Sequence, residues 1–290
     1  MIWTLAFLAS ASAEEIILAP GGETSIQSVI NDAMPGDIIT LTEGTYEEKL
    51  STESDGTEEA PITLRSAEDE EVVITHPGEV FQIENEYWII EGITFDGQYG
   101  NNDIIEIRDS ANHTRLNNVE VKQSGRDCID MDGPTGVRIS NSTIHHCLYF
   151  DADNDVRDEA HGITGGAVQD LRIENTDIHT FSGDGIQFDS NRSAPGWNNI
   201  YIEGCRFWLE PLTDDTAGFS AGDVPGDNAI ETRTWNTAPE ANLTIVNTKA
   251  WGFKDGMDVS NQAAFLFKEH VNVKLQRIQV HDSEIAFRLR

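Results

Sequence analysis

The side chains that could do chemistry in this sequence lie in short stretches where apolar and polar residues alternate. Read in chain order, the polar positions of these stretches change from acidic to basic: Asp130 and Asp132, Gln187 and Asp189, Glu231 and Arg233, Lys268, then Arg288 and Arg290. Carboxylates are ligands for Ca²⁺, whereas guanidinium and ammonium groups bind anions. We therefore expect a site where Asp189 and Glu231 hold calcium and the arginines and Lys268 receive an anionic ligand.

The alternation itself predicts β-strands, because successive side chains of a strand point to opposite faces of a sheet. The stretches are residues 81–84, 105–108, 129–132, 186–189, 230–233, 265–268 and 287–290. Their outward residues would lie beside one another if successive turns of the chain stack. Such stacking would turn the acidic-to-basic change into a gradient along one face.

A second pattern predicts that stacking. It consists of an apolar residue, any residue, Asn or Gly, two more residues and another apolar residue. Its third position is occupied by Gly92, Asn118, Asn141, Asn175, Gly204, Asn247 and, in a last copy, Arg277. Repeats of this length, built from short strands, indicate an all-β solenoid, a parallel β-helix with an Ile, Val and Phe interior. We expect the Asn side chains to form a hydrogen-bonded ladder at one bend.

The N-terminal part of the chain predicts two further elements. Residues 1–10 are apolar and Ala11-Ser12-Ala13 fits a cleavage site, so residues 1–13 are expected to be a secretory signal peptide. Apolar residues at helical spacing over 26–33, with Thr24 or Ser25 as N-cap, predict a short helix that covers the first coil. The remainder, 14–290, is expected to be a single domain that ends in mid-coil.

The net charge and the number of cysteines restrict which partners the protein can bind and how its thiols can pair. With 51 Asp and Glu against 19 Lys and Arg, the formal charge is −32, which argues against nucleic acid and anionic membranes as partners. An acidic substrate remains possible where a basic patch or a cation reverses the local field. Three cysteines, Cys128, Cys147 and Cys205, leave at least one thiol without an intramolecular partner, and we expect all three to be buried structural residues.

Several segments resemble right-handed parallel β-helix proteins of the pectate lyase superfamily, nearest to the branch of chondroitinase B and alginate lyases. These are Gly-Asp-Ile-Ile-Thr-Leu at 36–41 with Gly-Thr-Tyr at 44–46, Gly-Thr-Glu-Glu-Ala-Pro-Ile-Thr-Leu at 56–64, and Tyr-Trp-Ile-Ile-Glu-Gly-Ile-Thr-Phe at 87–95. The resemblance extends over about residues 22–290. It is more specific for the fold than for the activity, because one fold hosts many functions.

The resemblance implies a lyase that cleaves a uronate-containing polysaccharide by β-elimination. Lys268, 20 residues before Arg288, matches the branch's catalytic Lys and Arg. By this resemblance Lys268 would be the base, and Arg288 would assist at the leaving oxygen or the uronate carboxylate. Gln187, Arg233 and Arg290 would bind substrate. A base can remove the weakly acidic C5 proton only when the neighbouring carboxylate is neutralised by a metal or by cationic donors.

One departure from the branch leaves alternatives open. The branch has an acidic pair of calcium ligands shortly before its Lys, whereas this chain has Asn-Gln-Ala-Ala at 261–264. Either the metal has moved to Glu231 and Asp189, or the site works without calcium, or the protein is not a lyase. The alternative function is a non-catalytic β-helix that binds glycan or calcium at the cell surface.

Other segments carry weaker indications. The acidic residues over 151–159 suggest either a calcium loop or a solvated loop. His145, His146 and His161 could be ligands or acids, or hydrogen-bonded structural residues. Trp197, Trp208, Trp235 and Trp251 could stack on sugars or pack inside. The insertions over 149–162 and 208–227 are expected to form walls of a substrate groove.

Overall fold

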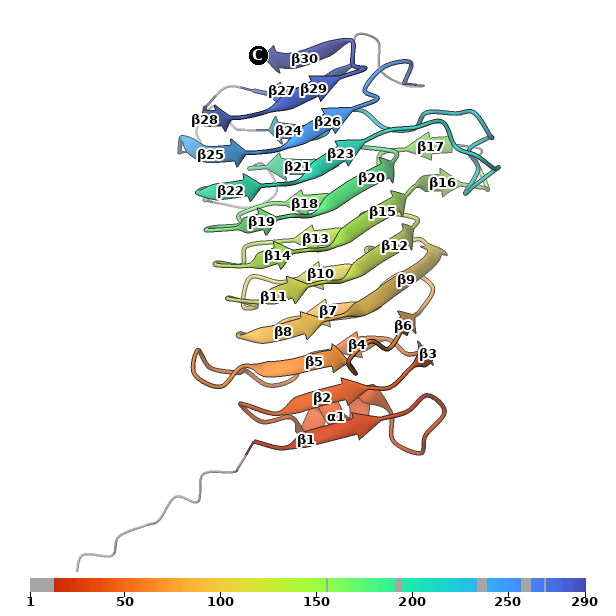
Figure 1. Ribbon diagram of the computed structural model, residues 1–290, viewed down its shortest axis with the longest axis vertical. Helices are drawn as coiled ribbons and strands as arrows, with labels where there is room; N and C mark the ends of the chain where they lie inside the picture. Colours follow the sequence, from red (N-terminus) through yellow and green to blue (C-terminus); the bar gives the residue numbers. More distant parts are fainter. Residues whose placement is uncertain (1–12, 155, 191–194, 234–238, 257–261, 269) are drawn as a thin grey trace, which may run out of the picture.

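The computed structural model describes residues 13–154, 156–190, 195–233, 239–256, 262–268 and 270–290. Within these residues the chain winds through three parallel sheets whose strands stack one above another along the long axis (Figure 1). This is the parallel β-helix predicted from the repeats. The predicted signal peptide lies almost wholly outside the described residues.

Each coil adds one strand to each of three sheets. The sheets are called first, second and third in the order in which the chain passes through them. The first sheet contains β1 (Glu15–Leu18), β2 (Ile38–Leu41), β5 (Ile62–Ser66), β8 (Trp88–Glu91), β11 (Arg115–Asn117), β14 (Arg138–Ser140), β19 (Arg172–Glu174), β22 (Ile200–Glu203), β25 (Ala241–Val246) and β28 (Val271–Gln276). The second sheet contains β3 (Gly44–Glu47), β6 (Val72–Thr75), β9 (Ile93–Gly100), β12 (Glu120–Ser124), β15 (Thr143–Cys147), β20 (Asp177–Phe181), β23 (Arg206–Trp208), β26 (Lys249–Trp251) and β29 (Gln279–His281). The third sheet contains β4 (Leu50–Ser51), β7 (Phe81–Ile83), β10 (Ile105–Ile107), β13 (Ile129–Met131), β18 (Ile163–Gly165), β21 (Ile186–Asp189), β24 (Ile230–Arg233), β27 (Ala263–Phe267) and β30 (Ile285–Leu289).

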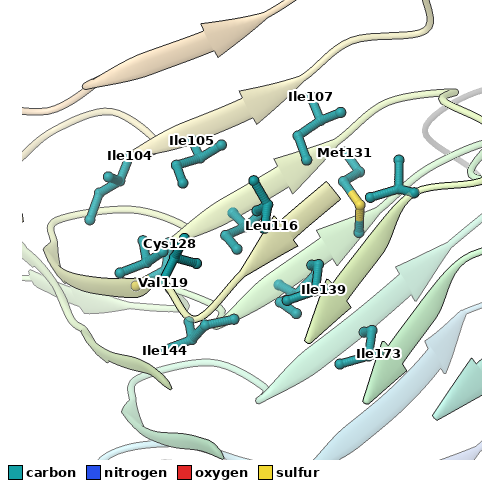
Figure 2. Close-up of a cluster of buried hydrophobic side chains, with 14 of the residues drawn as sticks. Ile104, Ile105, Ile107, Leu116, Val119, Cys128, Met131, Ile139, Ile144 and Ile173 are labelled. Carbon is teal, nitrogen blue, oxygen red and sulfur yellow. The ribbon is translucent and has the colours of Figure 1, made fainter. Parts of the chain in front are cut away.

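The interior is a stack of aliphatic and aromatic side chains in register. In the third sheet Ile105, Ile129 and Ile163 are direct neighbours on successive strands, and all three are fully buried. Figure 2 shows how such residues from the three sheets meet inside the coils. Burial of each isoleucine contributes about 1.5–3 kcal/mol, so each coil is held by its neighbours.

The expected bend between the first and second sheets forms where the repeat places Asn or Gly. Every one of its seven third positions has a left-handed backbone, with φ between 49° at Asn175 and 71° at Gly92. Asn and Gly tolerate this conformation better than other residues, which explains the pattern. The ladder is confirmed in part: the Nδ2 of Asn175 donates to the Oδ1 of Asn141 at 3.5 Å.

The short helix is also confirmed. Helix α1 (Ile26–Asp32) lies at the N-terminal end of the solenoid (Figure 1). Ser25 is its N-cap, and its Oγ accepts a hydrogen bond from the Ser28 amide at 3.1 Å. Ile26, Val29 and Ile30 are buried. The helix therefore covers the apolar end of the first coil, as a capping element must.

All three cysteines are buried, as expected, and two of them also form a bridge that the sequence did not reveal. Cys128 and Cys147 form a disulfide, whereas Cys205 is free and buried. The pair was not apparent in the sequence because Cys128 precedes β13 and Cys147 ends β15. The winding of one coil brings their Cα atoms to 5.6 Å. This separation is within the range that a disulfide needs.

We expect the double substitution Cys128→Ala/Cys147→Ala to lower the free energy of unfolding by about 2–4 kcal/mol, because the bridge restricts the unfolded chain. Chemical denaturation of the variant and the wild type measures the difference. Cys205→Ala is the matched control, since it removes a buried thiol without removing a bridge. A double variant as stable as Cys205→Ala would contradict this account.

The acidic segment over 151–159 forms a hairpin. Strand β16 (Tyr149–Asp151) pairs antiparallel with β17 (Val156–Asp158), and Asp155 lies outside the described residues. The Asp151 carboxylate accepts hydrogen bonds from the backbone amide of Asp153 at 2.9 Å and from the Asn154 side chain at 2.7 Å. Both of its oxygens thus serve the turn itself. The side-chain hydrogen bond from Asn154 lowers the pKa of Asp151.

The two insertions pack on each other. Leu148, Leu212 and Phe219 form a small apolar cluster beside the main core, and the Arg157 guanidinium lies over the Phe219 ring. Within the described part of the chain, no helix is long and apolar enough to cross a membrane.

Candidate functional site

The outward residues of the third sheet form columns that run along the solenoid. Glu231 pairs in register with Gln187 on one side and Leu266 on the other, and Leu266 pairs with Arg288. Arg233 pairs with Asp189. Extending the register by one residue sets Lys268 between Arg233 and Arg290. The gradient read from the sequence is therefore real, and its acidic and basic parts meet at Glu231.

Glu231 is the centre of a group of charged side chains that we call the Glu231 cluster: Glu231, Lys268, Arg233, Asp184 and Glu159. Its carboxylate accepts a hydrogen bond from the Lys268 ammonium and another from the Arg233 guanidinium, the latter at 3.2 Å. Only 6% of the Glu231 side chain is exposed, against 27% for Lys268 and 33% for Arg233. The two cations thus form the solvent-facing rim over a buried carboxylate.

A second buried acid, Asp184, touches Glu231 from the preceding coil. Its Oδ1 accepts from the Asn228 side chain at 2.8 Å and its Oδ2 from the Gln187 side chain at 3.0 Å. Burial and the neighbouring Glu231 charge raise the pKa of Asp184 well above its usual value. Burial alone would also raise the pKa of Glu231, but hydrogen bonds with Asp184, Arg233 and Lys268 lower it to about 2. The pair consequently consists of a protonated Asp184 that donates to an ionised Glu231.

His161 completes the buried side of the site. The backbone amide of Asp184 donates to its Nδ1 at 2.7 Å. Because an amide can only donate, Nδ1 carries no proton and the neutral ring holds its proton on Nε2. That Nε2 faces Glu159, 3.6 Å away, and Glu159 lies 3.4 Å from Arg233. Glu159 directly follows the β16–β17 hairpin, so the first insertion borders the site, as expected for a groove wall.

Arg233 has one group without a partner. Among the described residues its buried Nε finds no acceptor, although the guanidinium contacts both Glu231 and Glu159. Burial tends to lower the pKa of Arg233, but its hydrogen bond to Glu231 and the nearby acids raise it. A buried donor without an acceptor is uncommon in folded proteins. Arg233 is therefore a permanent cation with a hydrogen bond still to offer.

The predicted site residues are not all brought together. Lys268, Arg233 and Glu231 are in contact, and Gln187 reaches them through Asp184. Arg288 shares the column of Glu231 but is separated from it by Leu266. Arg290 is the cation that the register places beside Lys268. The catalytic role predicted for Arg288 stays a prediction.

The calcium prediction for Asp189 and Glu231 has little support from the geometry. In the described ranges no group of three or more His, Cys, Asp or Glu side chains is arranged to hold a metal ion. The Glu231 oxygens already accept hydrogen bonds from Lys268 and Arg233. Two protein cations therefore neutralise the carboxylate that the prediction assigned to Ca²⁺.

Sequence reasoning missed Asp184 and Asn228 and undervalued His161. All three lie two residues before the first apolar residue of a third-sheet strand, and the same position is occupied by a polar residue on five successive coils: Asp103, Asp127, His161, Asp184 and Asn228. The signal was present as a column of polar residues ahead of the alternating stretches. Among the same residues, burial and the Asp127 charge raise the pKa of Asp103 to about 7.

The tryptophans do not offer ring faces to a sugar. On the second sheet His145, His179, Trp208, Trp251 and His281 stack in register, with centroids 4.9, 4.1, 5.0 and 5.6 Å apart. Neighbouring rings cover both faces of Trp208 and Trp251, so only their edges reach solvent. Trp197 is buried against Phe188, and Trp235 lies outside the described residues. Packing is therefore the role of Trp197, Trp208 and Trp251.

This aromatic column predicts a loss of stability in acid. Burial and the neighbouring His145 lower the pKa of His179 to about 3, from 6.5 in the unfolded chain. The unfolded state then binds the proton more tightly, so stability is complete above pH 6.5 and falls as the pH drops toward 3. We expect a loss of about 1–2 kcal/mol from this residue at pH 5. Thermal unfolding of His179→Gln between pH 5 and 8 should show a weaker pH dependence than the wild type; an equal dependence would contradict the assignment.

Comparison with known proteins agrees with this geometry. The family model of chondroitinase B matches residues 22–149. Three solved structures are similar over nearly the whole chain. An alginate lyase from Paenibacillus sp. str. FPU-7 is 18% identical, with 94% of this chain and 97% of that one covered and a TM-score of 0.68. A pectate lyase is 16% identical, with 95% and 79% covered and a TM-score of 0.59. A polygalacturonase from Erwinia carotovora ssp. carotovora is 13% identical, with 97% of each chain covered and a TM-score of 0.56.

The chain is a parallel β-helix protein with a chondroitinase B-like N-terminal part. The predicted parallel β-helix fold is thus confirmed, and the predicted resemblance to chondroitinase B is matched over residues 22–149. No curated protein matches this β-helix protein significantly in sequence. The matched residues 22–149 end before the Glu231 cluster. The chemistry of that cluster therefore has to be argued from its own geometry.

Proposed function

We propose that this β-helix protein is a polysaccharide lyase that cleaves a uronate-containing chain by β-elimination at the Glu231 cluster. The observation that carries the proposal is the pair of partly exposed cations, Lys268 and Arg233, held over a buried carboxylate on the outer face of the third sheet. The similarity to an alginate lyase and a pectate lyase supports the same class of substrate.

Each step of the elimination has a candidate group. Arg233, whose side chain is 33% exposed, pairs with the uronate carboxylate and withdraws charge from it. Lys268 Nζ leaves Glu231, gives one proton to water and, as the neutral amine, takes the C5 proton. The C5–H electrons form the C4=C5 double bond, the C4–O bond breaks, and the leaving oxygen takes a proton from water. Glu231 keeps Arg233 as its partner while Lys268 moves, so the buried carboxylate is never left without a cation.

Lys268 and Arg290 lie side by side in register, which suggests a second cation for the same substrate. Arg290 and Arg288 both lie beyond Lys268 along the solenoid. In this proposal they bind the neighbouring uronate of the polymer. The assignment of Gln187 to substrate binding becomes indirect, because its amide holds Asp184.

The test is a screen of uronate polymers with purified protein, including alginate, pectate and chondroitin sulfate. The unsaturated end formed by elimination absorbs ultraviolet light and appears as a product that hydrolysis cannot give. Activity is measured with calcium and again with a chelator. Because protein cations neutralise Glu231, we expect the chelator to leave the rate unchanged; loss that calcium restores would support the metal site at Asp189 and Glu231.

Failure to form unsaturated ends on any uronate polymer would overturn the lyase proposal. Binding of these polymers without turnover would then favour the non-catalytic glycan-binding alternative. We also propose that the protein is exported, since the Cys128–Cys147 disulfide persists in oxidising compartments. N-terminal sequencing of secreted protein should find a mature chain that begins near Glu14, and an uncleaved N-terminus would contradict the predicted signal peptide.

A further inference from the structure

Three arginines form a row on the first sheet, far in sequence from Lys268. Arg115, Arg138 and Arg172 pair in register on β11, β14 and β19, and all three are exposed. Adjacent strands lie about 4.8 Å apart, so the three side chains rise from one straight line along the solenoid. We call Arg115, Arg138 and Arg172 the arginine row. It belongs to a different sheet from the Glu231 cluster.

No carboxylate forms an ion pair with the arginine row among the described residues, although Glu58 and Asp170 border it and Glu174 lies two residues after Arg172 on β19. The Arg172 guanidinium lies over the Tyr201 ring at 5.1 Å. Two other exposed arginines do have such partners: Arg65 pairs with Glu15 and Arg206 with Asp177. In a chain with 51 acidic residues against 19 basic ones, carboxylate partners are easily supplied.

Like charges in register destabilise a sheet. A row of arginines without ion pairs is therefore a cost to the folded protein unless something else binds it. Sequences keep such local conflicts mainly at functional sites. The row thus indicates an anionic ligand.

The row borders a pocket that suits an extended ligand. The pocket has a volume of about 580 Å³, and Tyr87 and His113 line it together with the arginines. Two acids, Glu58 and Asp170, also line it, and Asp170 is hydrogen-bonded by the Asn199 side chain. The arginines therefore line the pocket along the solenoid axis, across the strands, with polar and acidic side chains at its borders.

We propose that the arginine row binds an acidic polysaccharide that lies along the solenoid axis. The guanidinium groups would pair with carboxylates or sulfates on the polymer. Arg favours such anions because its guanidinium can donate two hydrogen bonds at once to two oxygens of one group. This second site would hold the polymer on a sheet other than the one with the Glu231 cluster, and its binding does not depend on turnover there.

The ring contacts favour a polysaccharide over a nucleic acid. Proteins that bind single-stranded nucleic acid offer free aromatic faces on which bases stack. Here Tyr87 stacks on His113 with centroids 4.7 Å apart, and Arg172 covers Tyr201. Charge pairing and hydrogen bonding remain the main contacts available, and these suit carboxylates or sulfates on a sugar chain.

The experiment measures binding of alginate, pectate and chondroitin sulfate by affinity electrophoresis at low salt. It uses the Lys268→Ala background, which prevents cleavage during the run. Arg115→Gln/Arg138→Gln/Arg172→Gln is expected to weaken binding of at least one polymer by about tenfold or more, because three charge-assisted contacts are lost. Arg65→Gln/Arg206→Gln/Lys254→Gln is the matched control: it removes the same charge from cations that already have acidic partners.

Two further readouts separate this site from the Glu231 cluster. Without polymer, Arg138→Gln should raise the melting temperature or leave it unchanged, because it relieves repulsion in the middle of the row. Any turnover of short uronate oligosaccharides should be the same in the arginine-row variant and the wild type. These readouts remain informative even if no lyase activity is found.

Three results would overturn the proposal. The first is that the arginine-row variant binds every polymer as tightly as its background. The second is that the control variant loses as much affinity as the arginine-row variant. The third is that single-stranded DNA binds through the row more tightly than the polysaccharides, which would assign it to nucleic acid.

Discussion

Lys268→Ala is expected to lower turnover of the uronate polymer by about a thousandfold while the protein stays folded. A positioned general base contributes on the order of 10²–10⁴ to the rate. Folding should persist because 27% of the Lys268 side chain is exposed and because its backbone amide, which donates to the Thr232 hydroxyl at 3.0 Å, is unchanged. The measurement is the rate of formation of unsaturated ends, with melting temperature as the check on folding.

Lys254→Ala is the control for this substitution. Lys254 also pairs with an acid, Asp282 at 3.5 Å, but both side chains are about half exposed and lie outside the Glu231 cluster. It should keep wild-type turnover. Turnover of Lys268→Ala within a few-fold of the wild type would show that Lys268 is not the base.

Lys268→Arg separates two roles that alanine removes together. Arginine keeps the positive charge beside Glu231 but stays protonated at any pH the protein tolerates. If Lys268 removes the C5 proton, kcat falls as in Lys268→Ala while KM is retained. If Lys268 only neutralises charge, both parameters stay near those of the wild type.

Much of the fold was predictable because the repeat records backbone conformation directly. The seven positions from Gly92 to Arg277 all adopt a positive φ, and Asn and Gly are the residues that tolerate it best. The alternating stretches identified the third sheet for the same kind of reason, since a strand that buries one face must alternate. Both patterns lie within a single coil, so they can be recognised in the sequence without knowing which coils are neighbours.

The site was less predictable because it depends on contacts between coils of different length. Asp184 and Glu231 are 47 positions apart in the sequence, and the intervening insertion hides their proximity. His161 is held by the Asp184 amide on the next coil. The disulfide was missed for a similar reason: only the path of one coil shows that Cys128 and Cys147 converge.

Whether the outward-facing tryptophans expose their ring faces also depends on contacts between coils. Trp208 and Trp251 face outward, as an exposed sugar platform would require. The parallel register, however, stacks the two rings with their centroids 5.0 Å apart, so neighbouring rings cover their faces. Alternation in the sequence indicates on which face of a sheet a side chain lies. The side chains that lie beside it on the neighbouring strands can be known only from the register of strand pairing.

Glu231→Gln and Asp184→Asn are expected to have opposite outcomes although each replaces a buried acid by its amide. Asn can donate to Glu231 as the protonated Asp184 does, and it can still accept from Asn228. Asp184→Asn should therefore not lower the free energy of unfolding at neutral pH. Glu231→Gln removes the charge that pairs with both Lys268 and Arg233. It should cost about 2–4 kcal/mol, since breaking a buried ion pair leaves its partners uncompensated.

The pH dependence of stability distinguishes a protonated Asp184 beside an ionised Glu231 from the reverse arrangement, in which Glu231 carries the proton. Glu231 has a folded pKa of about 2 against 4.5 when unfolded, so its contribution is complete above pH 4.5 and is lost as the pH falls through 2. Asp184 has a raised folded pKa, so its contribution is complete below 3.8 and is lost as the pH rises. Asp184→Asn should consequently gain stability relative to the wild type as the pH rises above 3.8, while Glu231→Gln stays less stable throughout. Denaturation of both variants across this range measures the two curves. Equal losses in both variants at neutral pH would mean that the proton does not reside on Asp184, and the direction of the hydrogen bond at the base of the site would have to be reversed.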